Sequence, residues 1–153
     1  MRLTSTAFAP DDWIPVQFTC EGADVSPPLA WSDPPPGTRS LALVCADPDA
    51  PGGVWYHWGI YDIPSNTRAL SEHWPPMRVP PPQAVNDFRR TGYGGPCPPR
   101  GDPPHHYRFR LYALNVEWLG LGPHAPCRAV EAAAQSHAIA AAELTGVYGR
   151  ART

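Results

Sequence analysis

The stretch VWYHWGIYDI, residues 54–63, is the clearest strand signal in the chain. In a strand its side chains alternate between two faces, so Trp55 and His57 are expected on one face and Tyr56 and Trp58 on the other. A second strand is predicted for residues 106–117, HYRFRLYALNVE. One of its faces is apolar and carries Tyr107, Phe109, Leu111 and Ala113. Its opposite face carries Arg108 and Arg110 and is expected to be solvated.

The other segments are shorter or less regular. The apolar run LALVCA, residues 41–46, predicts a strand buried on both faces. Residues 16–20 alternate like a strand, residues 26–31 suit an extended edge segment, and the proline-rich stretch 64–85 suggests a surface excursion with a helical turn near Leu70. A stripe of apolar residues at helical spacing predicts a helix over residues 128–144, with Gly146 ending it. These elements predict one domain, residues 1–153: a mainly β protein built as a β-sandwich with a C-terminal helix.

Composition narrows the function. The formal net charge is −2, and all twelve basic residues are arginine. This argues against a general binder of nucleic acid or of a membrane surface, which would show a basic stripe. It also excludes a Schiff-base mechanism, which would need a lysine. No apolar run approaches the ~18 residues that span a bilayer, and no signal peptide is visible, so we predict a cytoplasmic protein without a membrane span.

The four cysteines are widely spaced and are expected to be reduced thiols, with Cys20–Cys97 as the first candidate if a bridge forms.

Two stiff loops carry the candidate site. The first is DPDAP, residues 47–51, and the second is GYGGPCPPRG, residues 92–101, which leads to HHY at 105–107. Proline and glycine give such loops one well-defined shape, so they lose little entropy on binding. Asp47 and Asp49 point the same way in extended backbone, although on the residues alone an Asx-type turn is the simpler explanation of the pair. In the second loop, the free N–H groups of Gly94, Gly95 and Gly101 are expected to form an anion-binding nest. Pro98 and Pro99 stiffen its wall, and Arg100 supplies a rim charge.

Three further side chains are candidates. His57 lies in a strand, where a satisfied core histidine is the simpler interpretation, but the Asp47 loop is close enough to pair with it. His105 and Tyr107 share the apolar face of their strand, and buried polar groups there require partners. His106 has the opposite parity and is expected to be exposed.

These motifs, together with DVSPPLAW at 24–31, SLAL at 40–43 and ELTGVYGR at 143–150, resemble the phosphatidylethanolamine-binding protein family, and most closely its bacterial Raf-kinase-inhibitor-like branch. The resemblance covers nearly the whole chain. It implies an antiparallel two-sheet core and a pocket that holds an anion. The residues that it implies for ligand binding are Asp47, Asp49, His57, His105 and Tyr107. Gly94, Pro98 and Pro99 of the second loop complete the predicted site.

Three functions compete. The first is a non-catalytic binding protein for phosphate or a phosphorylated head group or side chain, and the resemblance adds a kinase or protease as protein partner, and a homodimer. The second is a metal-dependent enzyme, because Asp47, His57 and His105 could form a two-histidine, one-carboxylate site. The third is a hydrolase with a histidine base, but the G-x-S-x-G pattern of a nucleophile elbow is absent. We predict the first, with no metal and no cofactor, and with both histidines charging near neutral pH beside the carboxylates.

Overall fold

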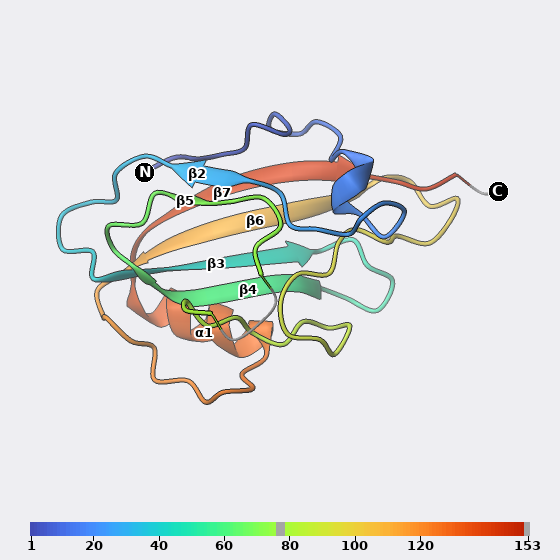
Figure 1. Ribbon diagram of the computed structural model, residues 1–153. Helices are drawn as coiled ribbons and strands as arrows, with labels where there is room; N and C mark the ends of the chain where they lie inside the picture. The colour runs from blue at the N-terminus through green and yellow to red at the C-terminus, as the bar shows by residue number, and fades with distance from the viewer. Residues whose placement is uncertain (76–78, 152–153) are drawn as a thin grey trace.

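The computed structural model describes residues 1–75 and 79–151. A four-stranded antiparallel sheet in the order β4-β3-β6-β7 forms its centre (Figure 1). Its strands are β3 (Ser40–Asp47), β4 (Trp55–Pro64), β6 (His105–Leu114) and β7 (Ala138–Tyr148). The predictions for β3, β4 and β6 are confirmed to within a few residues. Every residue of β3 is buried, as expected for a continuous apolar strand between two neighbours.

A small sheet covers one face of the central sheet. It pairs β1 (Leu3–Thr4), β2 (Leu29–Trp31) and β5 (Ala69–Leu70), all antiparallel. The main core fills the space between the two sheets. Its strand residues include the apolar face predicted for β6, from Tyr107 to Ala113. The predicted antiparallel two-sheet sandwich is confirmed.

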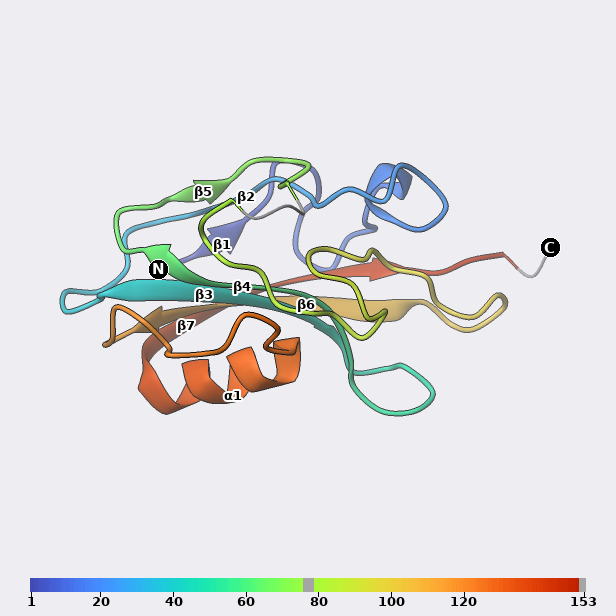
Figure 2. The ribbon, with the colours of Figure 1, turned by 60° about the horizontal axis from the view of Figure 1, so that its bottom comes forward.

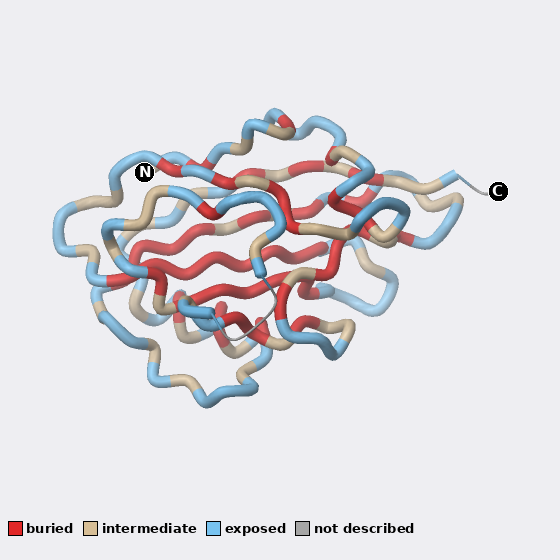
Figure 3. Tube along the Cα trace, viewed as in Figure 1, coloured by how far each residue is buried: buried red, intermediate tan, exposed pale blue. Residues whose placement is uncertain are grey.

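Helix α1 (Cys127–His137) covers the opposite face of the central sheet, so the molecule has three layers (Figure 2). A second core lies beneath the helix and contains Val130, Ala134 and Tyr112. The central strands are therefore buried on both faces, and they run as a buried band through the middle of the molecule (Figure 3). Among the described residues, no helix is long and apolar enough to cross a membrane.

Four predictions about the elements are wrong. The helix stops at His137, and residues 138–148 form β7, because this segment pairs with β6 along the whole of β6. Residues 16–18 form a short 3-10 helix, η1 (Val16–Phe18), closed by the bond from Phe18 N to Pro15 O, rather than a strand. β2 is the middle strand of the small sheet and not an edge, and Leu70 lies in β5 instead of a helical turn.

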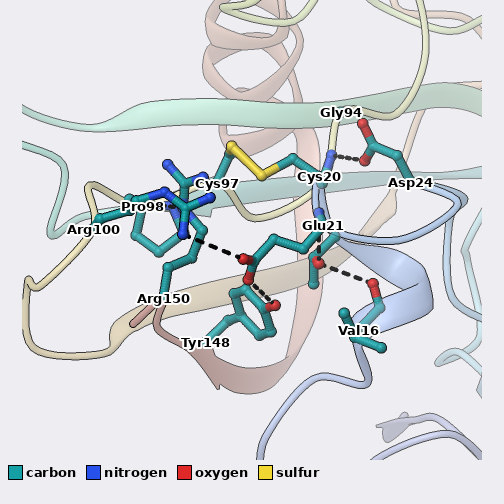
Figure 4. Close-up of a disulfide and its surroundings, with 12 residues drawn as sticks. Val16, Cys20, Glu21, Asp24, Gly94, Cys97, Pro98, Arg100, Tyr148 and Arg150 are labelled. Atoms are coloured by element: carbon teal, nitrogen blue, oxygen red, sulfur yellow. Dashed lines mark hydrogen bonds and ion pairs between the residues drawn. A yellow bond between two sulfur atoms is a disulfide. The ribbon is translucent and has the colours of Figure 1, made fainter. Parts of the chain in front are cut away.

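The prediction of four reduced thiols is also wrong. Cys20 and Cys97 form a disulfide across a sequence separation of 77 (Figure 4). The hydrogen bond from Cys20 N to Pro96 O brings the two segments together beside it. Cys45 and Cys127 are free and buried. Burial raises the pKa of both thiols, so they are unreactive compared with an exposed cysteine.

Candidate functional site

A cavity of about 210 Å³ lies at one end of the central sheet. The β3–β4 loop and the connection leading into β6 meet at this end (Figure 1). Its lining residues are Asp47, Ala50, Pro51, Trp55, His57, Phe88, Cys97, Pro98, Pro99, His105 and Tyr107. Six of the eight residues that we predicted for the site line this cavity. Asp49 and Gly94 do not.

A bulge in β4 places His57 on the cavity side. The register passes from Cys45↔Trp58 to Ala46↔Tyr56, so His57 is an extra residue opposite β3. Such a bulge re-aims a side chain, and it breaks the simple alternation predicted for this strand. The His57 ring now packs edge-on against Tyr107, with centroids 5.1 Å apart.

Gly94 acts on the site through its backbone. Its carbonyl oxygen accepts a bond of 2.6 Å from His57 Nδ1, which leaves Nε2 as the unprotonated nitrogen of the neutral ring. A Cβ at Gly94 would lie 2.6 Å from the ring of Phe88, so only glycine fits between that ring and the histidine. His57 is buried, and burial lowers its pKa.

His105 lies between two carboxylates. Nδ1 donates to Asp47 Oδ2 at 2.7 Å, and Nε2 donates to Asp102 Oδ2 at 3.1 Å. Both nitrogens carry a proton when both contacts form, so the ring is an imidazolium. Burial alone would lower the pKa of His105, but the bonds to Asp47 and Asp102 outweigh it and raise the pKa.

Tyr107 lies between the two histidines with its hydroxyl unpaired. Its ring stacks near His105, with centroids 6.5 Å apart, and the residue is 1% exposed. In the part of the chain that the structure describes, the hydroxyl is one of two buried side-chain polar atoms without a hydrogen-bond partner. An unpaired buried hydroxyl costs about 1–3 kcal/mol, so this atom is a strong indication of a missing partner.

Asp49 belongs to a different cluster. Its Oδ2 accepts from both the backbone N and Nδ1 of His106, at 2.8 and 2.7 Å, and both side chains are about half exposed. Burial alone would raise the pKa of Asp49, but the contacts with His106 lower it. The prediction that His106 is exposed is confirmed. Asp47 Oδ1 also accepts from Asp49 N at 2.7 Å, so the local Asx turn exists alongside the contact of Asp47 with His105.

The expected glycine nest is not available to a ligand. The N–H groups of Gly94, Gly95 and Gly101 donate to His57 O, Asp24 Oδ1 and Arg150 O. Pro98 and Pro99 form part of the wall, as expected. Arg150 holds this wall by donating from Nε to Pro98 O at 2.7 Å, and Arg100 lies 3.9 Å from Glu21 instead of at the cavity (Figure 4).

The metal alternative finds no support in the geometry. The described residues contain no group of three or more His, Cys, Asp or Glu side chains placed to hold a metal ion. The reason is visible in the bonds: His57 Nδ1 is engaged by Gly94, and both nitrogens of His105 are engaged by carboxylates.

Sequence reasoning missed three residues of the site region. Trp55 shares the predicted parity of His57, so the alternation of β4 could have identified it. Phe88 reaches the cavity from an irregular segment, and Asp102 reaches His105 from a turn. We find no sequence signal for either of them.

Fold and cavity together define a β-sandwich with a loop-lined pocket at one end of its central sheet. The chain belongs to the phosphatidylethanolamine-binding protein family, whose family model matches residues 4–149. A UPF0098 protein of Aquifex aeolicus is 47% identical over 98% of this chain and 89% of its own length. A UPF0098 protein of Methanothermobacter thermautotrophicus is 44% identical over 98% of this chain and 99% of its own.

Solved structures agree with this assignment. The crystal structure of Escherichia coli YbcL, described as a member of the mammalian family of these proteins, superposes with a TM-score of 0.91. The two chains are 35% identical, and the match covers 97% of each. The predicted family is therefore confirmed.

Proposed function

We propose that the cavity binds a small anion, such as phosphate or a phosphorylated head group or side chain, and that the protein does not catalyse a reaction. The buried, unpaired hydroxyl of Tyr107 is the observation that carries this proposal. An anion in the cavity would accept a hydrogen bond from it and remove the penalty of an unsatisfied group.

The positive charge of His105 also supports the proposal that the cavity binds an anion. Its imidazolium is a cation in a cavity whose lining, among residues 1–75 and 79–151, contains no arginine or lysine. Asp47 is buried beside it and keeps it charged, which explains a carboxylate near an anion site. His57 contributes a second donor only when it is protonated, because Nδ1 already faces Gly94 O.

The composition of the cavity lining favours binding over hydrolysis by a serine, threonine or cysteine nucleophile. In the part of the chain that the structure describes, the lining contains no serine or threonine, and Cys97 is held in the disulfide. We therefore expect no turnover of phosphate esters, peptides or acyl esters above that of a His57→Ala control. A kinase or protease as protein partner, and a homodimer, remain predictions from the family resemblance.

The decisive experiment replaces Tyr107 by Phe, which removes the hydroxyl and keeps the ring. Hydrogen bonds to charged groups contribute about 1.5–3 kcal/mol, so sulfate affinity should fall roughly tenfold or more. The free energy of unfolding should stay unchanged or rise, because the variant no longer buries an unpaired hydroxyl. Calorimetric titration with sulfate and urea denaturation measure the two effects.

Tyr112→Phe is the matched control. The Tyr112 hydroxyl donates to Glu131 on the helix-covered face of the same sheet, far from the cavity. This variant should lose stability and bind sulfate like the wild type. The proposal is wrong if Tyr107→Phe binds sulfate as tightly as the wild type, or if the wild type shows no saturable binding.

A further inference from the structure

The side chain of Asp102 occupies a contact that a bound anion would need. Its Oδ2 lies 3.1 Å from His105 Nε2, and it makes no other side-chain hydrogen bond among the described residues. The other nitrogen of His105 is held at 2.7 Å by Asp47, whose side chain is only 4% exposed. Nε2 is therefore the one N–H of His105 that a ligand can take, and in this structure a carboxylate takes it.

The two carboxylates differ in how easily they can leave. Asp47 is the last residue of β3, is buried, and also accepts from Asp49 N. Asp102 lies in a turn at the rim, closed by the bond from its own N to Pro99 O at 3.2 Å, and its side chain is 39% exposed. Its carboxylate can swing into solvent without disturbing a strand, whereas the Asp47 carboxylate cannot.

We propose that Asp102 acts as an internal anion that competes with the ligand for His105 and thereby sets how tightly the pocket binds an anion. This inference rests on the proposed anion-binding function of the cavity. An incoming anion must displace the Asp102 carboxylate from Nε2. Every anion breaks the same contact, so the competition lowers the affinity for a monoanion and for a dianion by the same factor. Asp102 is thus a residue that tunes the affinity of the pocket.

The test compares Asp102→Asn with wild type by calorimetric titration at pH 6 and fixed ionic strength. The substitution also removes one of the two contacts that raise the pKa of His105, while the contact with Asp47 stays. NMR of the His105 ring protons therefore accompanies the titration, and the pH is lowered for both proteins until the ring is charged in each. Sulfate should bind the variant about tenfold more tightly, since two charges in contact near a protein surface interact by a few kcal/mol. Formate should gain by about the same factor, because both anions must break the same Asp102–His105 contact in the wild type.

Asp33→Asn is the charge-matched control. Asp33 lies in the connection between β2 and β3, away from the cavity. Its side chain is 92% exposed and pairs with Arg68. The Asp33→Asn variant should bind sulfate and formate as the wild type does. This control separates local competition at His105 from the general loss of one negative charge.

The outcomes are distinct. If wild type binds sulfate and Asp102→Asn binds it equally or more weakly, the competitor role is wrong and the pocket proposal stands. A gain in sulfate affinity without a comparable gain in formate affinity also contradicts competition for His105. If no variant and no wild-type sample binds sulfate, both the competitor role and the proposed function are wrong.

Discussion

His57 and His105 show how the same side chain acquires two different roles in one cavity. Both are buried, yet the pKa of His57 is lowered by burial while the pKa of His105 is raised by its two carboxylates. We expected both histidines to charge near neutral pH. Burial overturned this for His57, because its Nδ1 faces the carbonyl of Gly94 and not a carboxylate, and this contact does not outweigh the burial.

An NMR titration of the histidine ring protons should resolve this difference. His105 should titrate above the usual value of about 6.5, and His57 below it. For stability, the contribution of His105 is complete below about 6.5 and is lost as pH rises through its folded pKa. The contribution of His57 is present above about 6.5 and is lost as pH falls through its folded pKa. A His57 ring that titrates above His105 would contradict the assignment of both environments.

The residues of the site were only partly predictable. Side-chain parity on β6 correctly placed His105 and Tyr107 inward and His106 outward, because an unbroken strand has a strict period of two. Asp49 was misplaced because β3 ends at Asp47 and the chain turns there: Asp49 N donates to Asp47 Oδ1 in an Asx turn, so the parity of an extended strand does not hold between the two residues. Asp102 is three residues before His105, and only the turn at 99–102 brings its carboxylate back to the ring.

At the scale of elements, the strands were easier to predict than the boundary between α1 and β7. β3, β4 and β6 carry their patterns in their own residues. Residues 138–142 are AIAAA, a composition that favours a helix, but their pairing with β6 is long-range and absent from the local sequence. Tertiary pairing outweighed local helix propensity in this segment. The same holds at Gly146, which was expected to end the helix. That glycine lies within β7, where a Cβ would lie 2.6 Å from the Ile14 side chain.

The docking of α1 on the sheet depends on Glu131. This buried carboxylate accepts from Tyr56 Oη at 2.7 Å and Tyr112 Oη at 2.9 Å. Glu131→Ala leaves two hydroxyls without their acceptor and should lower the free energy of unfolding by about 3 kcal/mol in urea denaturation.

Glu117→Ala provides the comparison for that measurement. Glu117 pairs with Arg39 at 3.6 Å, and both side chains are more than half exposed, so its loss should change stability by less than about 1 kcal/mol. Equal effects of the two substitutions would refute the role of the buried network.

At the scale of the whole molecule, the Cys20–Cys97 disulfide joins two loops that lie far apart in the sequence. Cys97 lines the cavity, and Cys20 lies two residues after the end of η1, so the bridge ties the cavity wall to the N-terminal part of the chain (Figure 4). Disulfides persist in oxidising compartments, so the bridge counts against the cytoplasmic location predicted from the sequence. The location itself remains a prediction.

Thiol counting tests the bridge. The unfolded, unreduced protein should show two reactive thiols, from Cys45 and Cys127, and four after reduction. The Cys20→Ser, Cys97→Ser double variant should lose roughly 2–4 kcal/mol of stability, because a long loop in the unfolded chain is no longer closed. Four reactive thiols before reduction would show that the bridge does not form.

The central claim is that one anion binds between His57, Tyr107 and His105. The most direct measurement follows the histidine ring signals of the wild type during titration with sulfate at pH 6, with chloride at equal ionic strength as control. His57 and His105 should shift saturably with one common dissociation constant, while His73, His124 and His137 stay fixed. Signals of His57 and His105 that do not move, or that move equally with chloride, would contradict the claim.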